Sequence, residues 1–350
     1  MQSHVFIAVS MGDPGGIGPR LIAQVTASGR FAKRARLLVF GDAATLAQAA
    51  ALDGLKIEFP TIADTSDLAE RIARLSHAPL IVIEPPECPS GGFARGEVSP
   101  LNGAASVAWI KAGTKACLAG IAQALVTAPI SKEAIRAAGV CFPGHTELLA
   151  SLTDGCEVRM MLVGRRLRVV LETIHVALSQ VPRLIEHDHL IRSLEIIHEW
   201  SLQFLRRSPN IAVCGLNPHA GENGQFGREE IEVIGPAIEQ ARKRGIGAWG
   251  PFPADTVFHR ASHGEFDFVL SMYHDQGLGP LKTVAFDTGV NVTLGLPFVR
   301  TSPDHGTAFD RAWVREARLS CRSFEQAIKL ALRWGTAAGR LSSARRHKNQ

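Results

Sequence analysis

The chain has 350 residues, of which 46% are hydrophobic and 20% charged, so it can bury a large core and is not intrinsically disordered. No apolar stretch reaches the roughly 20 residues that a bilayer requires, which excludes a membrane-spanning protein. The formal net charge of +5 comes from scattered short basic clusters, without the basic face that nucleic-acid binding requires. The six cysteines form no CxxC pair and the apolar N-terminal run lacks a preceding basic region, so we expect a cytoplasmic protein with reduced thiols.

Apolar runs bounded by Gly, Pro and Asp alternate with amphipathic stretches along the chain, which predicts alternating strands and helices. A buried strand over 5–9 is followed by a glycine-rich turn and a helix over 19–26 that has proline at its first position. Asp67 and Glu70 are expected to cap a later helix. Further strands are predicted at 37–40, 80–83, 124–127, 160–163, 211–214 and 268–272.

This alternation predicts an α/β protein of about two domains with a mostly parallel sheet, whose ligands bind beyond the carboxyl ends of the strands. Residues 245–250 match the dinucleotide pattern G-x-G-x-x-G, but they follow a predicted helix and run into prolines. The pattern requires the reverse order, so we expect an ordinary helix-to-strand loop. The turn over 12–18 does lie between a strand and a helix, and either an anion site or a tight turn explains it.

Histidines in loops are the stronger chemical signal. His175, His219 and His274 lie near predicted strand ends, and three neutral imidazoles with an open position are typical of a catalytic metal site. The three are far apart in the sequence, so a hydrogen-bonding role for each remains the alternative. Arg300 and Lys282 are candidates for binding a carboxylate or phosphate, and surface salt bridges are their alternative role.

Seven blocks in order along the chain resemble the PdxA family, the 4-hydroxythreonine-4-phosphate dehydrogenases of pyridoxal phosphate biosynthesis and their relatives that act on phosphorylated sugar acids. These blocks are GDPGGIGP (12–19), TAPISKEAI (127–135), FPGHTELLA (142–150), CGLNPHAGENGQFGREEI (214–231), GPFPADTVF (250–258), MYHDQGLGPLK (272–282) and GVNVTLGLPFVRTSPDHGTAFD (289–310).

The resemblance implies a homodimer with a two-lobed fold like that of the isopropylmalate and isocitrate dehydrogenases, with mostly parallel sheets. The active site is expected in the cleft between the lobes, at the dimer interface. Residues 1–128 and 297–350 would form the nucleotide-binding lobe. Residues 129–296 would form the lobe for metal, substrate and dimerisation.

The resemblance also assigns roles by position. A divalent metal, expected to be zinc with Co, Ni, Mn or Mg as alternatives, would be held by His175, His219 and His274. Substrate contacts would be His145, Thr146, Lys282, Asn291 and Arg300. NAD or NADP would meet Gly12, Asp304, His305, Gly306, Thr307 and Ala308. The catalytic group would comprise His145, Asp255 and Lys282, with His145 or Asp255 as the base that accepts the hydroxyl proton.

The expected reaction is metal-dependent oxidation of 4-(phosphooxy)-L-threonine by NAD(P)+ to a 3-keto acid, which decarboxylates to 3-amino-2-oxopropyl phosphate. The alternatives are 4-phospho-D-threonate, the corresponding erythronate, or an aromatic cis-dihydrodiol carboxylate as substrate, and, more distantly, a non-enzymatic protein that binds anions or nucleic acid. Two departures from the family pattern leave the substrate open. Arg20 stands where Glu is common, and Ser131 where Asn or His is usual.

Overall fold

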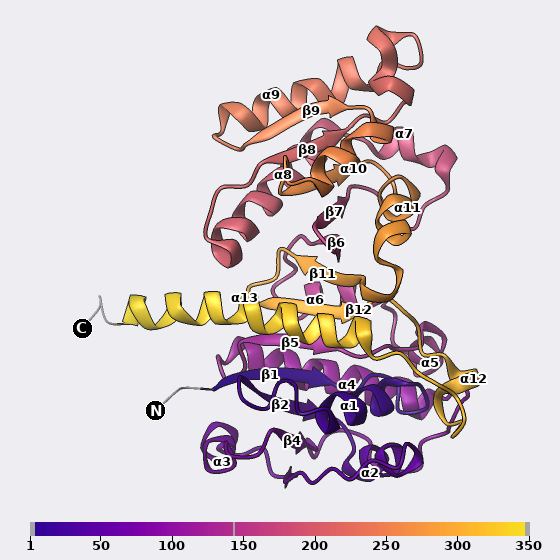
Figure 1. The fold of residues 1–350 in the computed structure, drawn as a ribbon, viewed down its shortest axis with the longest axis vertical. Helices are drawn as coiled ribbons and strands as arrows, with labels where there is room; N and C mark the ends of the chain where they lie inside the picture. Colours follow the sequence, from indigo (N-terminus) through magenta and orange to yellow (C-terminus); the bar gives the residue numbers. More distant parts are fainter. Residues whose placement is uncertain (1–3, 143, 347–350) are drawn as a thin grey trace. The chain divides into compact units, whose positions relative to one another are not determined.

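The computed structural model describes residues 4–142 and 144–346, which belong to two compact units (Figure 1). The first unit comprises Met1–Cys156 and Leu296–Gln350, and the second comprises Glu157–Gly295. The predicted lobes differ from these units mainly in residues 129–156, which lie with the first unit because helix α5 packs on helix α4 there. Pro143, inside the FPGHTELLA block, lies outside the described residues.

The first unit is built on a parallel sheet with the strand order β3-β4-β2-β1-β5-β12. Every residue of β2, β4 and β5 is buried, as expected for parallel strands covered on both faces. Helices α4 and α13 pack along its central strands. The strands are β1 (Val5–Ser10), β2 (Ala35–Phe40), β3 (Thr61–Ile62), β4 (Leu80–Ile83), β5 (Ala124–Thr127) and β12 (Val299–Pro303). The helices are α1 (Gly18–Ala27), α2 (Ala43–Leu52), α3 (Leu68–Arg74), α4 (Pro100–Leu118), α5 (Lys132–Ala137), α6 (His145–Ser151), α12 (Phe309–Ala312) and α13 (Arg322–Arg346).

The second unit has a mixed sheet with the order β11-β6-β7-β10-β8-β9. The pairs β11–β6 and β6–β7 are antiparallel, and β7, β10, β8 and β9 run parallel. The strands are β6 (Arg159–Gly164), β7 (Leu167–Leu171), β8 (Ile211–Cys214), β9 (Ala248–Phe252), β10 (Phe268–Ser271) and β11 (Val290–Leu294). The helices are η1 (Leu178–Gln180), α7 (Val181–Leu184), α8 (His187–Trp200), η2 (Ser201–Leu205), η3 (Pro218–Gly224), η4 (Glu230–Ile234), α9 (Gly235–Lys243), α10 (Ala254–Ser262), α11 (His274–Ala285) and η5 (Phe286–Thr288).

The mixed α/β class with mostly parallel strands is confirmed, and the G-x-G-x-x-G match covers the loop after α9 and the start of β9, as expected for a helix-to-strand connection. The expected cap of α3 is wrong. Asp67 adopts a left-handed conformation with φ of 51° and makes no side-chain hydrogen bond to the helix. Across residues 4–142 and 144–346, no helix combines the length and apolar character needed to cross a membrane.

Candidate functional site

The three predicted metal-binding histidines all follow parallel strands of the second unit. His175 comes after β7, His219 lies in η3 after β8, and His274 opens α11 after β10. Because β10 pairs with both β7 and β8 in parallel, the carboxyl ends of these strands meet at one edge of the sheet. The fold therefore brings the three loops to the same edge, although they are far apart in the sequence.

Hydrogen bonds tie these loops together. The Thr173 hydroxyl donates to the Met272 carbonyl at 2.7 Å, which links the ends of β7 and β10. The buried Gln276 side chain accepts from the Met272 N–H at 2.7 Å and donates to the Gly215 carbonyl at 2.8 Å. This amide joins the His274 loop to the loop after β8.

His175 and His274 are the pair that the structure places together, with ring centroids 5.7 Å apart. His274 Nδ1 lies 2.7 Å from the Asp275 carboxylate, and His219 Nδ1 lies 3.2 Å from Glu222. A carboxylate at Nδ1 fixes the imidazole and leaves Nε2 for a ligand, as in many metal sites. Within the described part of the chain, no group of three His, Cys, Asp or Glu side chains stands in a metal-binding arrangement.

The His219 loop has an unusual backbone. Residues 219–224 all have positive φ, between 43° and 94°, although four of the six are not glycine. Such a run costs about 1–2 kcal/mol per non-glycine residue and requires support from outside. Glu230 supplies it: its carboxylate accepts from the N–H groups of Leu216 and Asn217 at 2.7 and 2.8 Å, and from the Asn217 amide at 3.0 Å.

Replacing Glu230 with glutamine is therefore expected to lower the free energy of unfolding by about 1–3 kcal/mol, because the new amide N–H₂ faces the donor of Asn217. Urea unfolding would measure the change. Glu232→Gln, at an exposed residue paired with Arg228, is the matched control and should change little. Equal effects of the two substitutions would show that Glu230 does not support the loop.

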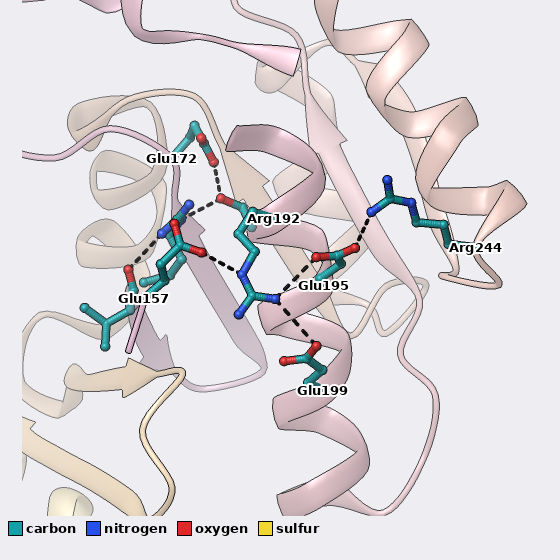
Figure 2. Close-up of polar contacts among 9 residues, drawn as sticks. Glu157, Glu172, Arg192, Glu195, Glu199 and Arg244 are labelled. Carbon is teal, nitrogen blue, oxygen red and sulfur yellow. Dashed lines mark hydrogen bonds and ion pairs between the residues drawn. The ribbon is translucent and has the colours of Figure 1, made fainter. Parts of the chain in front are cut away.

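A second polar cluster lies behind the end of β7 (Figure 2). Glu172 is half-buried, and burial raises its pKa, an effect that hydrogen bonding to Ser193 opposes. Ser193 also accepts from Arg159 Nε at 2.6 Å. Next to it on α8, Arg192 pairs with Glu157 and with carboxylates of its own helix. These contacts fasten the strand end that precedes His175 to helix α8.

The first unit contains a cationic site at the start of β12, beside the carboxyl end of β5. Arg300 is 2% exposed and donates through Nη2 to the Thr127 hydroxyl at 2.6 Å. It lies within β12, so its alternative role in a surface salt bridge is wrong. His145 opens α6, and its Nε2 is buried without a hydrogen-bond partner among the described residues. Burial, and then the charges of Arg300 and Lys132, hold the pKa of His145 well below its usual range.

The other predicted substrate and catalytic residues are divided between the two units. Thr146 follows His145 in the first turn of α6. Asp255 is exposed in the first turn of α10, and Lys282 lies in the last turn of α11. Asn291 lies on β11, and its Oδ1 is buried with no partner in the described ranges. The last three share the second unit with the histidines.

The predicted cofactor residues surround the turn after β1 in the first unit. A Cβ on Gly12, which has φ of +76°, would lie 2.4 Å from the Pro129 carbonyl, so only glycine fits there. The Ile17 N–H donates to the Thr307 carbonyl at 2.9 Å, which joins this turn to the predicted segment of Asp304, His305, Gly306, Thr307 and Ala308. Two polar residues were not predicted from the sequence: Asp13, which lies in this turn, and Lys132, whose charge acts on His145.

Asp13 is a candidate functional residue that the sequence could have indicated, because it is the one acidic residue in the glycine-rich turn over 12–18. Its side chain is inaccessible to solvent, and burial raises its pKa to about 6 against the opposing hydrogen bonds from the Gly15 N–H and Asn102. Those donors reach Oδ1 at 2.9 and 3.1 Å. Oδ2 has no partner in the described part of the chain. A buried carboxylate with one unused oxygen costs stability, which is typical of functional turns.

Comparisons with known proteins agree with this organisation. A family model described as pyridoxal phosphate biosynthetic protein PdxA matches residues 33–331. The 4-hydroxythreonine-4-phosphate dehydrogenase of Geobacter metallireducens is 44% identical over 95% of this chain and 96% of its own. The D-threonate 4-phosphate dehydrogenase of Pectobacterium atrosepticum is 41% identical over 89% of this chain and 94% of its own length.

A solved structure is similar over almost the whole chain. The crystal structure of 4-hydroxythreonine-4-phosphate dehydrogenase from Klebsiella pneumoniae has a TM-score of 0.85 and 39% identity, and covers 95% of this chain and 98% of its own. The match therefore includes both units, with the histidine loops and the cationic site. The chain belongs to the PdxA family.

Proposed function

We propose that the protein is an NAD(P)-dependent dehydrogenase that oxidises 4-(phosphooxy)-L-threonine to its 3-keto acid, which loses CO₂ to give 3-amino-2-oxopropyl phosphate. The observation that carries the proposal is the buried Arg300 beside His145 and Lys132, in a family whose members are named for small phosphorylated substrates. A guanidinium that is shielded from solvent and held by a hydrogen bond to Thr127 is suited to binding a phosphate or carboxylate.

The chain's own residues divide the work as follows. Arg300 neutralises one anionic group of the substrate, and Lys282 a second. Thr146 and Asn291 donate or accept hydrogen bonds that orient the reacting hydroxyl.

His145 is neutral at physiological pH, since its pKa is depressed, and can therefore accept the hydroxyl proton. Asp255 is the alternative base. NAD(P)+, bound along Gly12 and the Asp304–Ala308 segment, supplies the hydride acceptor.

We also propose that His175, His219 and His274 hold a divalent metal, with zinc as the first candidate. The chemistry of the donor set suits such an ion, since His219 and His274 each have a carboxylate at Nδ1 and His175 lies beside His274, and the three side chains would have to close around it. When bound, the metal would act as a Lewis acid that lowers the pKa of the substrate hydroxyl and polarises the ketone.

The protein is proposed to act as a homodimer. Large apolar side chains are exposed on the second unit, among them Phe286 at 76%, Leu178 at 68% and Phe226 at 54%. Side chains of this kind are the ones that a subunit interface would bury. Sedimentation velocity would measure the oligomeric state.

D-threonate 4-phosphate is the second candidate substrate. Relatives with that name are 40–41% identical to this chain, close to the 40–44% of relatives named for 4-hydroxythreonine-4-phosphate. The two acids share the phosphate and differ at the amino-bearing carbon. Ser131, the departure closest to the cationic site, uses its hydroxyl to accept the Ala134 N–H at 3.1 Å and so caps α5.

The proposed function is tested by NAD(P)H formation from a panel of substrates. We expect turnover of 4-phosphohydroxythreonine, and less or none of phosphothreonate, phosphoerythronate and a cis-dihydrodiol carboxylate. A chelator should abolish the turnover and added zinc should restore it. Preference for phosphothreonate would favour the second candidate. No turnover of any substrate with metal present would exclude the dehydrogenase assignment.

A further inference from the structure

Helix α10 of the second unit (Figure 1) carries two histidines one turn apart. Val257, Phe258 and Ala261 form its buried face, whereas His259 and the C-cap residue His263 are exposed. Side chains four residues apart on a helix are neighbours. The two imidazole ring centroids are indeed only 4.3 Å apart, with the ring planes tilted by 36°.

The His263 ring is held so that one of its nitrogens remains for a ligand. Its Nδ1 lies 2.8 Å from the His259 carbonyl, which can only accept, so Nδ1 donates its proton there. The Ser262 hydroxyl, 3.2 Å from the same Nδ1, donates to that carbonyl at 2.7 Å. An imidazole that donates through Nδ1 to a backbone carbonyl presents Nε2 as a metal ligand. In the ranges that the structure describes, no hydrogen bond engages the His259 ring.

The charges around the pair favour a cation. Arg260, next to His259, is neutralised by Glu265, whose carboxylate accepts from Nε and Nη2 at 2.9 and 2.5 Å. The Arg260 guanidinium also lies over the rings of Phe252 and Phe266, which pack in the core of this unit. The last turn of a helix has unpaired carbonyl groups, and its partial negative charge favours a bound cation.

The spacing of the two rings suits a single ion between them. Histidines at positions i and i+4 of a helix are an established metal-binding pattern. Around a tetrahedral ion with metal–nitrogen bonds of about 2.0–2.1 Å, two Nε2 atoms lie about 3.3 Å apart, which is close to the separation of these rings. Among the described residues, no third His, Cys, Asp or Glu completes a metal-binding group, so water would fill the remaining positions.

The topology separates this pair from the three loop histidines. Helix α10 starts after β9, at the carboxyl edge of the sheet, and returns the chain to the start of β10 at the other edge. Its last turn therefore lies towards the edge opposite to the loops that carry His175, His219 and His274.

We infer that His259 and His263 bind a borderline divalent ion, Zn²⁺, Ni²⁺ or Cu²⁺, through their Nε2 atoms. Imidazole nitrogen suits these ions, whereas Mg²⁺ and Ca²⁺ prefer oxygen ligands. The site is separate from the proposed active-site metal, is not required for turnover, and does not depend on the proposed function. A bound ion links the last two turns of α10 and so stabilises the helix whose first turn carries Asp255.

Calorimetric titration of the chelator-treated full chain with Zn²⁺ tests the inference. His259→Asn and His263→Asn each remove one of the two protein ligands, so each is expected to weaken zinc binding on α10 by at least about tenfold. Zinc should also raise the melting temperature of the wild type more than that of either variant. His189→Asn, at an exposed histidine of α8, is the matched control and should leave zinc binding unchanged.

NAD(P)H formation in the presence of zinc distinguishes this site from the loop histidines. Both α10 variants should retain the turnover of the wild type, whereas His219→Ala should lose turnover and still bind zinc on α10. If the α10 variants bind zinc as tightly as the wild type does, the two rings form only a stacked contact and the inference is wrong, while the dehydrogenase assignment stands. If they lose zinc and turnover together, the separate role of the site is wrong. Thermal unfolding without metal shows whether each variant is folded.

Discussion

Replacement of Arg20 with methionine is expected to lower the free energy of unfolding by about 3–5 kcal/mol, the usual cost of leaving a buried charge without its partner. Arg20 is 2% exposed and pairs with Asp53, which is itself 10% exposed. Its remaining donors reach four backbone carbonyls in one segment, those of Arg311, Ala312, Val314 and Ala317, at 2.9–3.2 Å. The variant would leave the Asp53 carboxylate with Gln24 as its donor and would remove the side-chain donor from all four carbonyls.

Lysine should not rescue this position, because an ammonium group has three donors and lacks the planar geometry that reaches Asp53 and the carbonyls together. Urea unfolding of Arg20→Met, Asp53→Asn and the double variant forms a mutant cycle. We expect the double variant to lose less than the sum of the single variants. Arg71→Met is the control, since its pair with Asp64 is exposed and worth about 0–1 kcal/mol.

A loss of stability in Arg20→Met no greater than in Arg71→Met would show that the buried pair does not anchor the segment 311–317. The expected result also explains the departure from the family pattern at this position. The Arg20 guanidinium is occupied by Asp53 and by the backbone carbonyls of the segment 311–317, so it holds this segment in place and has no donor directed at a substrate. Its presence is accounted for without a change of substrate.

Local sequence patterns predicted the buried strands and the helix start that depend only on neighbouring residues. The strands at 37–40, 80–83 and 124–127 are continuous apolar runs, and the helix after Gly18 starts with proline. The decoy glycine motif could be rejected because the helix before it was evident. The cap at Asp67 failed because the backbone there turns left-handed, which lies outside what a capping pattern encodes.

Strand order, the support of the His219 loop and the burial of Arg300 depend on contacts between distant residues, so the sequence did not predict them. β10 lies between β7 and β8 although it follows both in the chain, and this strand order is what brings His274 beside His175. The positive φ values around His219 depend on Glu230, which belongs to the same family block but supports the loop through contacts that no local pattern encodes. The burial of Arg300 likewise results from its register against Leu125 on β5 rather than from its neighbours in sequence.

His145 is the residue whose loss should reduce turnover most. Removing a general base usually costs about 10²–10⁴ in rate, so we expect kcat of His145→Asn to fall by about that factor with the fold unchanged. The Nε2 atom is buried without a partner among the described residues, so it is available to accept a proton from a substrate. Steady-state NAD(P)H formation measures the effect. Asp255→Asn, which removes the alternative base, is measured alongside it.

The pH profile distinguishes the two bases. Because burial and the charges of Arg300 and Lys132 depress the pKa of His145, its neutral form should persist well below the pH at which an ordinary histidine becomes protonated. The acid limb of the kcat profile should therefore lie below about pH 6.5. Lys132→Met removes one positive charge, which raises the pKa of His145 and moves this limb to higher pH. Lys111→Met, at an exposed lysine of α4, should leave it in place.

If Asp255 is the base, removal of a positive charge beside His145 has no reason to move the limb, and Asp255→Asn rather than His145→Asn shows the large loss of kcat. An unshifted limb in Lys132→Met together with near-normal turnover of His145→Asn would therefore assign the proton to Asp255. If His145 is the base, the same cations serve two purposes, since Arg300 and Lys132 attract the anionic substrate and also keep the imidazole neutral. Substitution of Lys132 should then raise KM as well as move the limb.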